Sequence, residues 1–87
     1  MTNVTGNTTK APSGPYWYWT KLGPNNVDLT NKGATLPPGH YTLYWDFRGQ
    51  PGSHLTFSID GPSGPIVTED DVVPSNGHGW GVKPFVI

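Results

Sequence analysis

Residues 40–60 contain two runs in which large apolar side chains alternate with polar ones, on either side of a turn rich in glycine and proline. Alternation with a period of two is typical of β-strands that bury one face. The large side chains that share this face are Tyr41, Leu43, Trp45, Phe47, Leu55, Phe57 and Ile59. A second layer must cover them, so the pattern predicts an all-β fold, a small antiparallel β-sandwich (Ig-like or a partly open barrel) of about five to seven short strands.

The two runs are predicted to pair with each other as a central hairpin over residues 40–60, with residues 49–53 as its loop. Apolar side chains then pair as Leu43 with Ile59, Trp45 with Phe57 and Phe47 with Leu55. On the outward face, the same register gathers an acid, two bases and a hydroxyl, which are Asp46, Arg48, His54 and Thr56. An open hairpin face lacks the dry pocket that tunes the pKa of catalytic groups, so we expect no enzyme.

Other residue groups give little support for a metal ion or a cofactor. The histidines His40, His54 and His78 lack the paired spacing of zinc ligands. The acidic cluster at residues 69–71 offers oxygen ligands for Ca²⁺, but three adjacent carboxylates cannot all converge on one ion. A solvated loop is the preferred interpretation of the cluster, although cation binding stays open, and we expect no cofactor.

Composition and charge restrict the partners that this chain can bind. The 87 residues carry a net charge of −1 and five scattered lysines and arginines, so we expect no nucleic-acid partner. No apolar run is long enough to span a bilayer, and MTNVTGNTTK lacks the pattern of a signal peptide. We therefore expect a chain that is made in the cytoplasm and binds no membrane. Because there is no cysteine, no disulfide supports the core.

Residues 1–14 contain almost no apolar side chains, because Thr, Asn, Gly and Pro dominate the segment. Such a segment alone cannot bury enough surface to offset the entropy cost of ordering it. We therefore predict an extended polar N-terminal arm over residues 1–14, which becomes ordered on a partner, and a single β-sandwich domain over residues 15–87.

The segment PYWYWTKL at residues 15–22 is a predicted strand rich in aromatic residues. Alternation alone leaves two choices for its inward face, Trp17 with Trp19 or Tyr16 with Tyr18. We prefer the tryptophans, because a small core without cysteine needs large rings. The aromatic residues expected to be exposed are then Tyr16, Tyr18, Tyr44 and Trp80.

The remaining segments are predicted as short strands and turns without any helix. Short strands are expected at residues 27–29, 66–68 and 82–87, and a loop is expected at residues 74–81. The segment LPPGHYTL at residues 36–43 is similar to the turn that opens a strand in many Ig-like sandwich modules.

In layout, with a polar N-terminal arm joined to a compact β-rich body, the chain from Met1 to Ile87 resembles the small decoration and accessory proteins of phage capsids. The resemblance implies attachment to the outer shell of a virion at contacts between capsid subunits, which it would stabilise. We therefore expect a non-enzymatic structural protein that docks on a larger protein assembly and can self-associate into an oligomer.

Partner contacts are expected on the arm, on the outward face of the hairpin and at the apolar C terminus, which can add a strand to a neighbouring sheet. The predicted partner-binding residues are Thr2, Asn3, Val4, Thr5, Thr8, Thr9, Lys10, Tyr44, Asp46, Arg48, Phe85, Val86 and Ile87. The alternative function is a small carbohydrate-binding, lectin-like β-sandwich module, in which exposed tyrosines and tryptophans stack against sugars.

Overall fold

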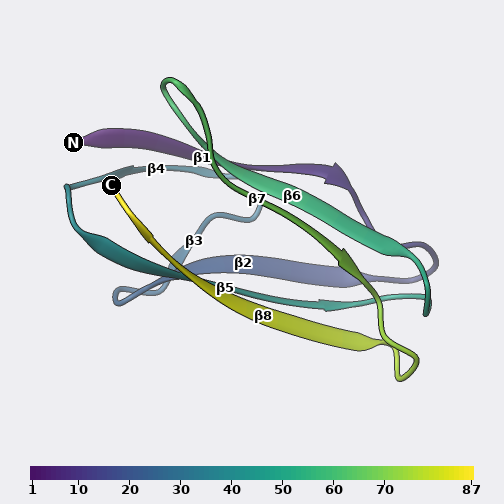
Figure 1. Ribbon diagram of the computed structural model, residues 1–87. Helices are drawn as coiled ribbons and strands as arrows, with labels where there is room; N and C mark the ends of the chain where they lie inside the picture. The colour runs from purple at the N-terminus through teal and green to yellow at the C-terminus, as the bar shows by residue number, and fades with distance from the viewer.

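The computed structural model describes all residues from 1 to 87 and consists of eight strands without a helix. The strands are β1 (Thr2–Lys10), β2 (Trp17–Gly23), β3 (Val27–Asp28), β4 (Gly33–Leu36), β5 (His40–Arg48), β6 (His54–Gly61), β7 (Gly64–Val72) and β8 (His78–Val86). They form two four-stranded antiparallel sheets, with the orders β4-β1-β6-β7 and β3-β2-β5-β8, which lie over each other in two layers (Figure 1). The predicted all-β sandwich is confirmed.

The predicted central hairpin is wrong in its pairing and right in its buried face. β5 pairs with β2 and β8, whereas β6 pairs with β1 and β7, so residues 49–53 connect the two sheets. The side chains of Leu43, Phe47 and Leu55 are at most 2% exposed. A hairpin would have left this apolar face uncovered, and placing one run over the other lets the two faces cover each other.

Trp45 and Phe57 show the consequence of this arrangement most clearly. The sequence predicts them as neighbours within one sheet, but they meet across the sandwich with ring centroids 5.5 Å apart in an edge-to-face orientation. Both are buried, together with ten other apolar residues of the core.

The predicted N-terminal arm is wrong, because residues 2–10 form strand β1 in the interior of a sheet. β1 pairs with β4 on one side and with β6 on the other. Val4 is 1% exposed and belongs to the core, and Gly6 is also buried. Hydrogen bonds to two neighbouring strands order this polar segment, so the boundary expected between residues 14 and 15 does not divide the fold.

The preferred orientation of the aromatic strand is also wrong. Tyr18, Thr20 and Leu22 of β2 lie opposite Phe47, Trp45 and Leu43 of β5, and this is the inward face. Trp17 and Trp19 therefore point out of the sandwich. Tyr18 was expected at the surface, but it packs against the core.

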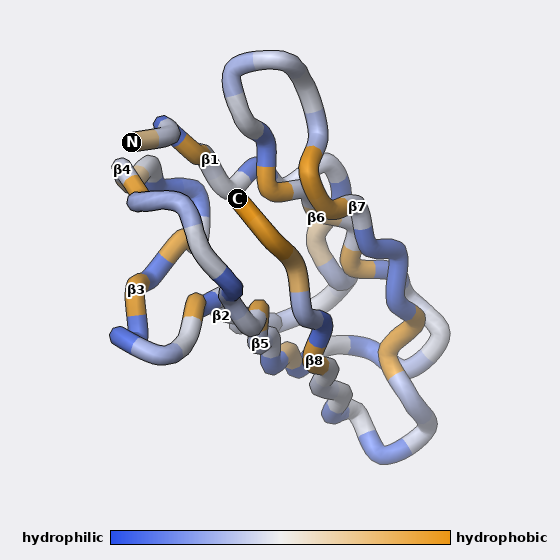
Figure 2. Tube along the Cα trace, turned by 60° about the vertical axis from the view of Figure 1, so that its left-hand side comes forward, coloured by the Kyte–Doolittle hydropathy of each residue, from blue (hydrophilic) through white to orange (hydrophobic).

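Three further segments differ from the short strands and loops that were expected. β4 was not anticipated, β7 continues through the acidic cluster, and β8 begins at His78 inside the predicted loop at residues 74–81. In Figure 2 the middle of β7 is hydrophilic, whereas the C-terminal part of β8 is hydrophobic. Backbone pairing of β4 with β1, of β7 with β6 and of β8 with β5 overrides the weak local preferences of these residues.

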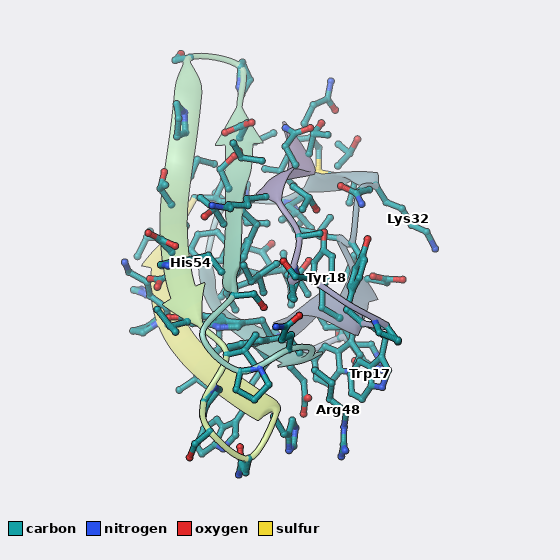
Figure 3. All side chains as sticks on the ribbon, turned by 90° about the vertical axis from the view of Figure 1, so that its right-hand side faces the viewer. Trp17, Tyr18, Lys32, Arg48 and His54 are labelled. Carbon is teal, nitrogen blue, oxygen red and sulfur yellow. The ribbon has the colours of Figure 1, made fainter.

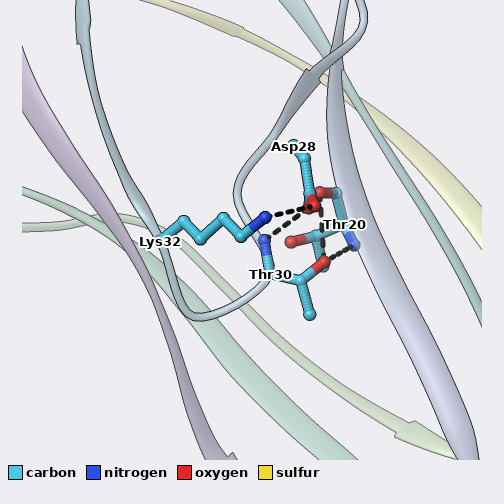
Figure 4. Close-up of polar contacts among 4 residues, drawn as sticks. All are labelled: Thr20, Asp28, Thr30 and Lys32. Carbon is cyan, nitrogen blue, oxygen red and sulfur yellow. Dashed lines mark hydrogen bonds and ion pairs between the residues drawn. The ribbon is translucent and has the colours of Figure 1, made fainter.

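The segment that follows β3 closes one side of the sandwich (Figure 4). The Thr30 amide donates a hydrogen bond to Asp28 Oδ1 at 2.9 Å, and the Thr20 amide donates to Thr30 Oγ1 at 2.8 Å. The Gly6 amide donates to the Lys32 carbonyl at 2.9 Å, which ties the segment to the other sheet. Leu29, which is 0% exposed, is thereby held between the two layers.

The hydrogen bond from the Thr30 amide lowers the pKa of Asp28 below its ordinary value of 3.8, and the Thr30 hydroxyl and Lys32 act in the same direction. The ionised carboxylate therefore stabilises the fold above about pH 3.8, and this contribution disappears as the pH falls through the lower pKa of the folded state. Asp28→Asn keeps an acceptor oxygen but removes the charge. We expect it to lower the melting temperature at pH 7 by about 2–4 °C, and to differ little from the original protein at about pH 2.

Thermal melts of both proteins at the two pH values measure this effect. A deficit of the Asp28→Asn variant that is as large at pH 2 as at pH 7 would show that the charge of Asp28 does not contribute to stability.

Two polar contacts close the opposite side of the sandwich, between β7 and the other sheet. The Trp45 indole N–H donates a hydrogen bond to Asp71 Oδ2 at 2.6 Å. Lys83 Nζ lies 3.1 Å from Glu69 Oε1. Because each contact joins one sheet to the other, the layers are fixed at both sides.

Candidate binding face

The predicted group of Asp46, Arg48, His54 and Thr56 does not exist in the structure. The first two residues lie on β5 and the last two on β6, which belong to different sheets. Figure 3 shows His54 and Arg48 in different parts of the molecule. His54 Nδ1 lies 3.1 Å from Asp70 Oδ1, and the Thr56 hydroxyl donates to the same oxygen at 3.1 Å. These contacts, with His54 first, lower the pKa of Asp70.

Each of the three acidic residues at positions 69–71 has its own partners. Glu69 contacts Lys83, Asp70 contacts His54 and Thr56, and Asp71 accepts the indole hydrogen bond of Trp45. Alternation along β7 sends neighbouring carboxylates to opposite faces. No group of three potential metal ligands is present in the protein.

The outer surface of the β3-β2-β5-β8 sheet carries most of the exposed aromatic side chains. The register of β2, β5 and β8 arranges its residues in three rows, which are Trp17–Arg48–His78, Trp19–Asp46–Trp80 and Lys21–Tyr44–Val82. We call these nine residues the aromatic face. Their side chains point away from the core because their neighbours along each strand point into it.

Three of the four tryptophans of the protein lie on this face. Trp80 is 71% exposed and Trp17 is 45% exposed, whereas Trp45 on the inner side of the same sheet is 5% exposed. The third tryptophan of the face, Trp19, is half-buried. Since the core is complete without these three rings, their position cannot be explained by the packing of the fold.

A carboxylate lies at the centre of the aromatic face. Asp46 lies between Trp19 and Trp80 in the middle row, and its Oδ1 is 2.7 Å from Nε2 of His78. The side chains of Asp46 and His78 are only 24% and 34% exposed. His78 thus holds Asp46 in a fixed position, while Asp46 Oδ2 has no hydrogen-bond partner within the protein.

Two cationic groups lie against tryptophan rings of the face. Lys21 Nζ is 4.7 Å from the centroid of the Trp19 ring, and Arg48 Cζ is 5.5 Å from that of Trp17. Figure 3 shows Arg48 and Trp17 side by side. These distances are in the range of cation–π interactions. Such contacts hold the charged ends of both side chains against the rings of the face.

No pocket opens on the aromatic face. Gly79 and Gly81 of β8 lie so close to the rings of Phe47 and Trp45 that a Cβ at either position would overlap them, and this brings β8 tightly onto the core. The one depression of the protein lies on the other sheet, between β1 and β4. Small molecules bind in concave pockets, so a face without a pocket suits an extended partner.

The structure brings together only some of the predicted partner-binding residues. Tyr44, Asp46 and Arg48 share the aromatic face. The predicted residues of β1 lie in the opposite sheet, and Val4 is buried in the core. At the C terminus, Phe85 and Ile87 pack partly against the core, whereas Val86 is 61% exposed.

Sequence reasoning missed Trp17, Trp19, Lys21 and His78 as site residues. The outward orientation of Trp17 and Trp19 could have been predicted from the residues that follow them in the strand. Lys21 has the same parity as the tryptophans, and Leu22 has the same parity as Tyr18 and Thr20. Continuing the alternation to this lysine and leucine places the tryptophans outside, because a lysine is almost never buried without a partner. No comparable signal marks His78, whose role depends on its pairing with Asp46.

The fold and the face together define a small β-sandwich protein with exposed aromatic side chains on the outer face of one sheet. Comparison with models of protein families, with curated proteins and with solved structures finds no match to this chain. The structure has no helix with the length and apolar character needed to cross a membrane.

Proposed function

We propose that the protein is a non-enzymatic attachment module that binds a polysaccharide through the aromatic face. The observation that carries the proposal is the position of exposed Trp17 and Trp80 and half-buried Trp19 around a fixed carboxylate on one face of a sheet. Sugar rings have apolar C–H faces that pack on flat aromatic rings, and their hydroxyl groups donate hydrogen bonds to carboxylates. Asp46 Oδ2 supplies such an acceptor between two rings.

Docking on a larger protein assembly, such as the shell of a virion, is the second candidate. Val82 and Val86 are 51% and 61% exposed and continue the apolar surface along β8, as a protein partner would require. The argument from a free N-terminal arm no longer applies, because β1 belongs to the sandwich. We therefore prefer the polysaccharide.

Binding of the purified protein to immobilised polysaccharides tests the proposal, with a neutral β-glucan, chitin and polygalacturonate as probes. We expect saturable binding to at least one probe and at least tenfold weaker binding by Trp80→Ala. The melting temperature of this variant changes by only a few degrees, because Trp80 is exposed.

Val72→Ala is the matched control. Val72 is an exposed apolar residue of β7, in the other sheet, and its removal leaves binding unchanged. The proposal is wrong if no probe is retained, or if Trp80→Ala and Val72→Ala bind as well as the original protein.

A further inference from the structure

Only some of the lysine and arginine side chains form ion pairs with carboxylates, and we call the others free cations. Lys32 and Lys83 each form an ion pair, with Asp28 and Glu69. Lys21, Arg48 and Lys10 have no carboxylate within ion-pair distance. Two of these three free cations lie on the aromatic face, and Lys10 lies at the end of β1 in the other sheet.

Most of the acidic residues, in contrast, lie away from the aromatic face. Four of the six, namely Asp60, Glu69, Asp70 and Asp71, lie in the other sheet. Asp28 of β3 lies opposite Lys21 at the border of the aromatic face, where it forms an ion pair with Lys32. Asp46 alone lies on the face itself, and one of its oxygens contacts His78. With histidines neutral, the nine residues of the face carry two positive charges and one negative charge, and the bordering pair of Asp28 and Lys32 adds none, so the net charge is +1, although the whole chain has a net charge of −1.

The two free cations lie on opposite sides of the central row. Arg48 is in the row on one side of Trp19–Asp46–Trp80, and Lys21 is in the row on the other side. Four residues of strand separate the two rows, which corresponds to about 13 Å along the sheet. An extended chain that crosses the central row therefore reaches a guanidinium at one end and an ammonium at the other.

Resting on the function proposed above, we infer that the polysaccharide is anionic and carries carboxylates, as a polyuronate does. A sugar ring lies on Trp80, while Arg48 and Lys21 bind carboxylates of different residues of the same chain. The guanidinium offers a planar pair of N–H donors that matches a carboxylate, and the lysine offers a point charge. Such charge-assisted hydrogen bonds discriminate against a neutral chain of the same shape.

Polygalacturonate and its fully methyl-esterified form are the probes that test this inference, because esterification removes the charge and keeps the sugar ring. We expect the acid form to bind at least tenfold more tightly than the ester to the original protein in low salt. The ratio of the two affinities, acid form to ester, falls to about threefold or less in Arg48→Gln and in Lys21→Gln. The same ratio also decreases in 0.5 M salt, because salt screens the charges.

Lys10→Gln is the matched control, because it removes a free cation from the other sheet and keeps the full preference. Equal binding of the acid and the ester by the original protein, with both lost in Trp80→Ala, overturns the inference and leaves the proposed function standing. An equal loss of preference in Lys10→Gln and Arg48→Gln also overturns it, because the attraction then follows net charge alone. No binding to any polysaccharide overturns both.

Discussion

Gly6→Ala is expected to destabilise the protein by about 3 kcal/mol or more, a large effect for the addition of one methyl group. Gly6 is a buried residue of β1, and a Cβ at this position would overlap the backbone carbonyl of Leu29. That carbonyl cannot move away easily, because the Leu29 amide donates to the Thr20 carbonyl at 2.9 Å and the Leu29 side chain is fully buried. The melting temperature should fall by about 12 °C or more.

Gly33→Ala on the neighbouring strand is the matched control for this prediction. A Cβ at Gly33 would lie 3.4 Å from the Val4 carbonyl oxygen, which is close to an ordinary contact. We expect a change within about 0.5 kcal/mol. Thermal and urea unfolding of the two variants, followed by tryptophan fluorescence, measure the difference. Equal stability of the two variants would mean that β1 does not pack between β4 and β6 against Leu29. The N-terminal residues would then behave as a free arm.

Trp45→Ala is expected to destabilise the protein by about 3–5 kcal/mol, which is a large part of the stability of a domain of this size. The substitution removes a ring that is 5% exposed and packs edge-to-face on Phe57. It also removes the indole N–H that donates to Asp71, and with it a contact that joins the two sheets. The cavity cannot close easily, since Gly81 has no side chain with which to fill it.

The same substitution at Trp80 is the control, because Trp80 lies on the outer side of the same sheet and is 71% exposed. We expect Trp80→Ala to unfold within about 0.5 kcal/mol of the original protein, and Trp45→Ala to unfold at far lower urea concentration. Urea unfolding curves of both variants separate the two roles of tryptophan. Similar losses in both would contradict the division between rings of the core and rings of the outer face.

The alternation in residues 40–60 was sufficient to predict the sandwich and the inward side chains of β5 and β6. It could not predict their partners, because the period of a strand determines which face is buried but not which strand lies beside it. A five-residue connection can close a hairpin or cross between sheets, and nothing local to residues 49–53 distinguishes these outcomes. Only the need to cover both apolar faces distinguishes a connection between sheets from a hairpin.

The other differences have equally specific causes. β1 was interpreted as an arm because few of its residues are apolar, but Val4 and the absent side chain of Gly6 suffice when the strand pairs on both sides. Trp17 and Trp19 were assigned to the core on their size alone, although the parity of Lys21 pointed outward. The fixed pair of Asp46 and His78 joins residues 32 positions apart, so it required the register of β5 and β8.

The free edges of the two sheets have a consequence for how the protein behaves at high concentration. β7 and β8 are long edge strands, a form that favours fibril growth through addition of further strands. β8 has a proline at position 84 that lacks an amide proton, and β7 carries three consecutive acidic residues that repel a second copy. Both features oppose the addition of a second copy along the free edges of the sheets, whereas the exposed rings of the aromatic face lie on the outer face of the sheet.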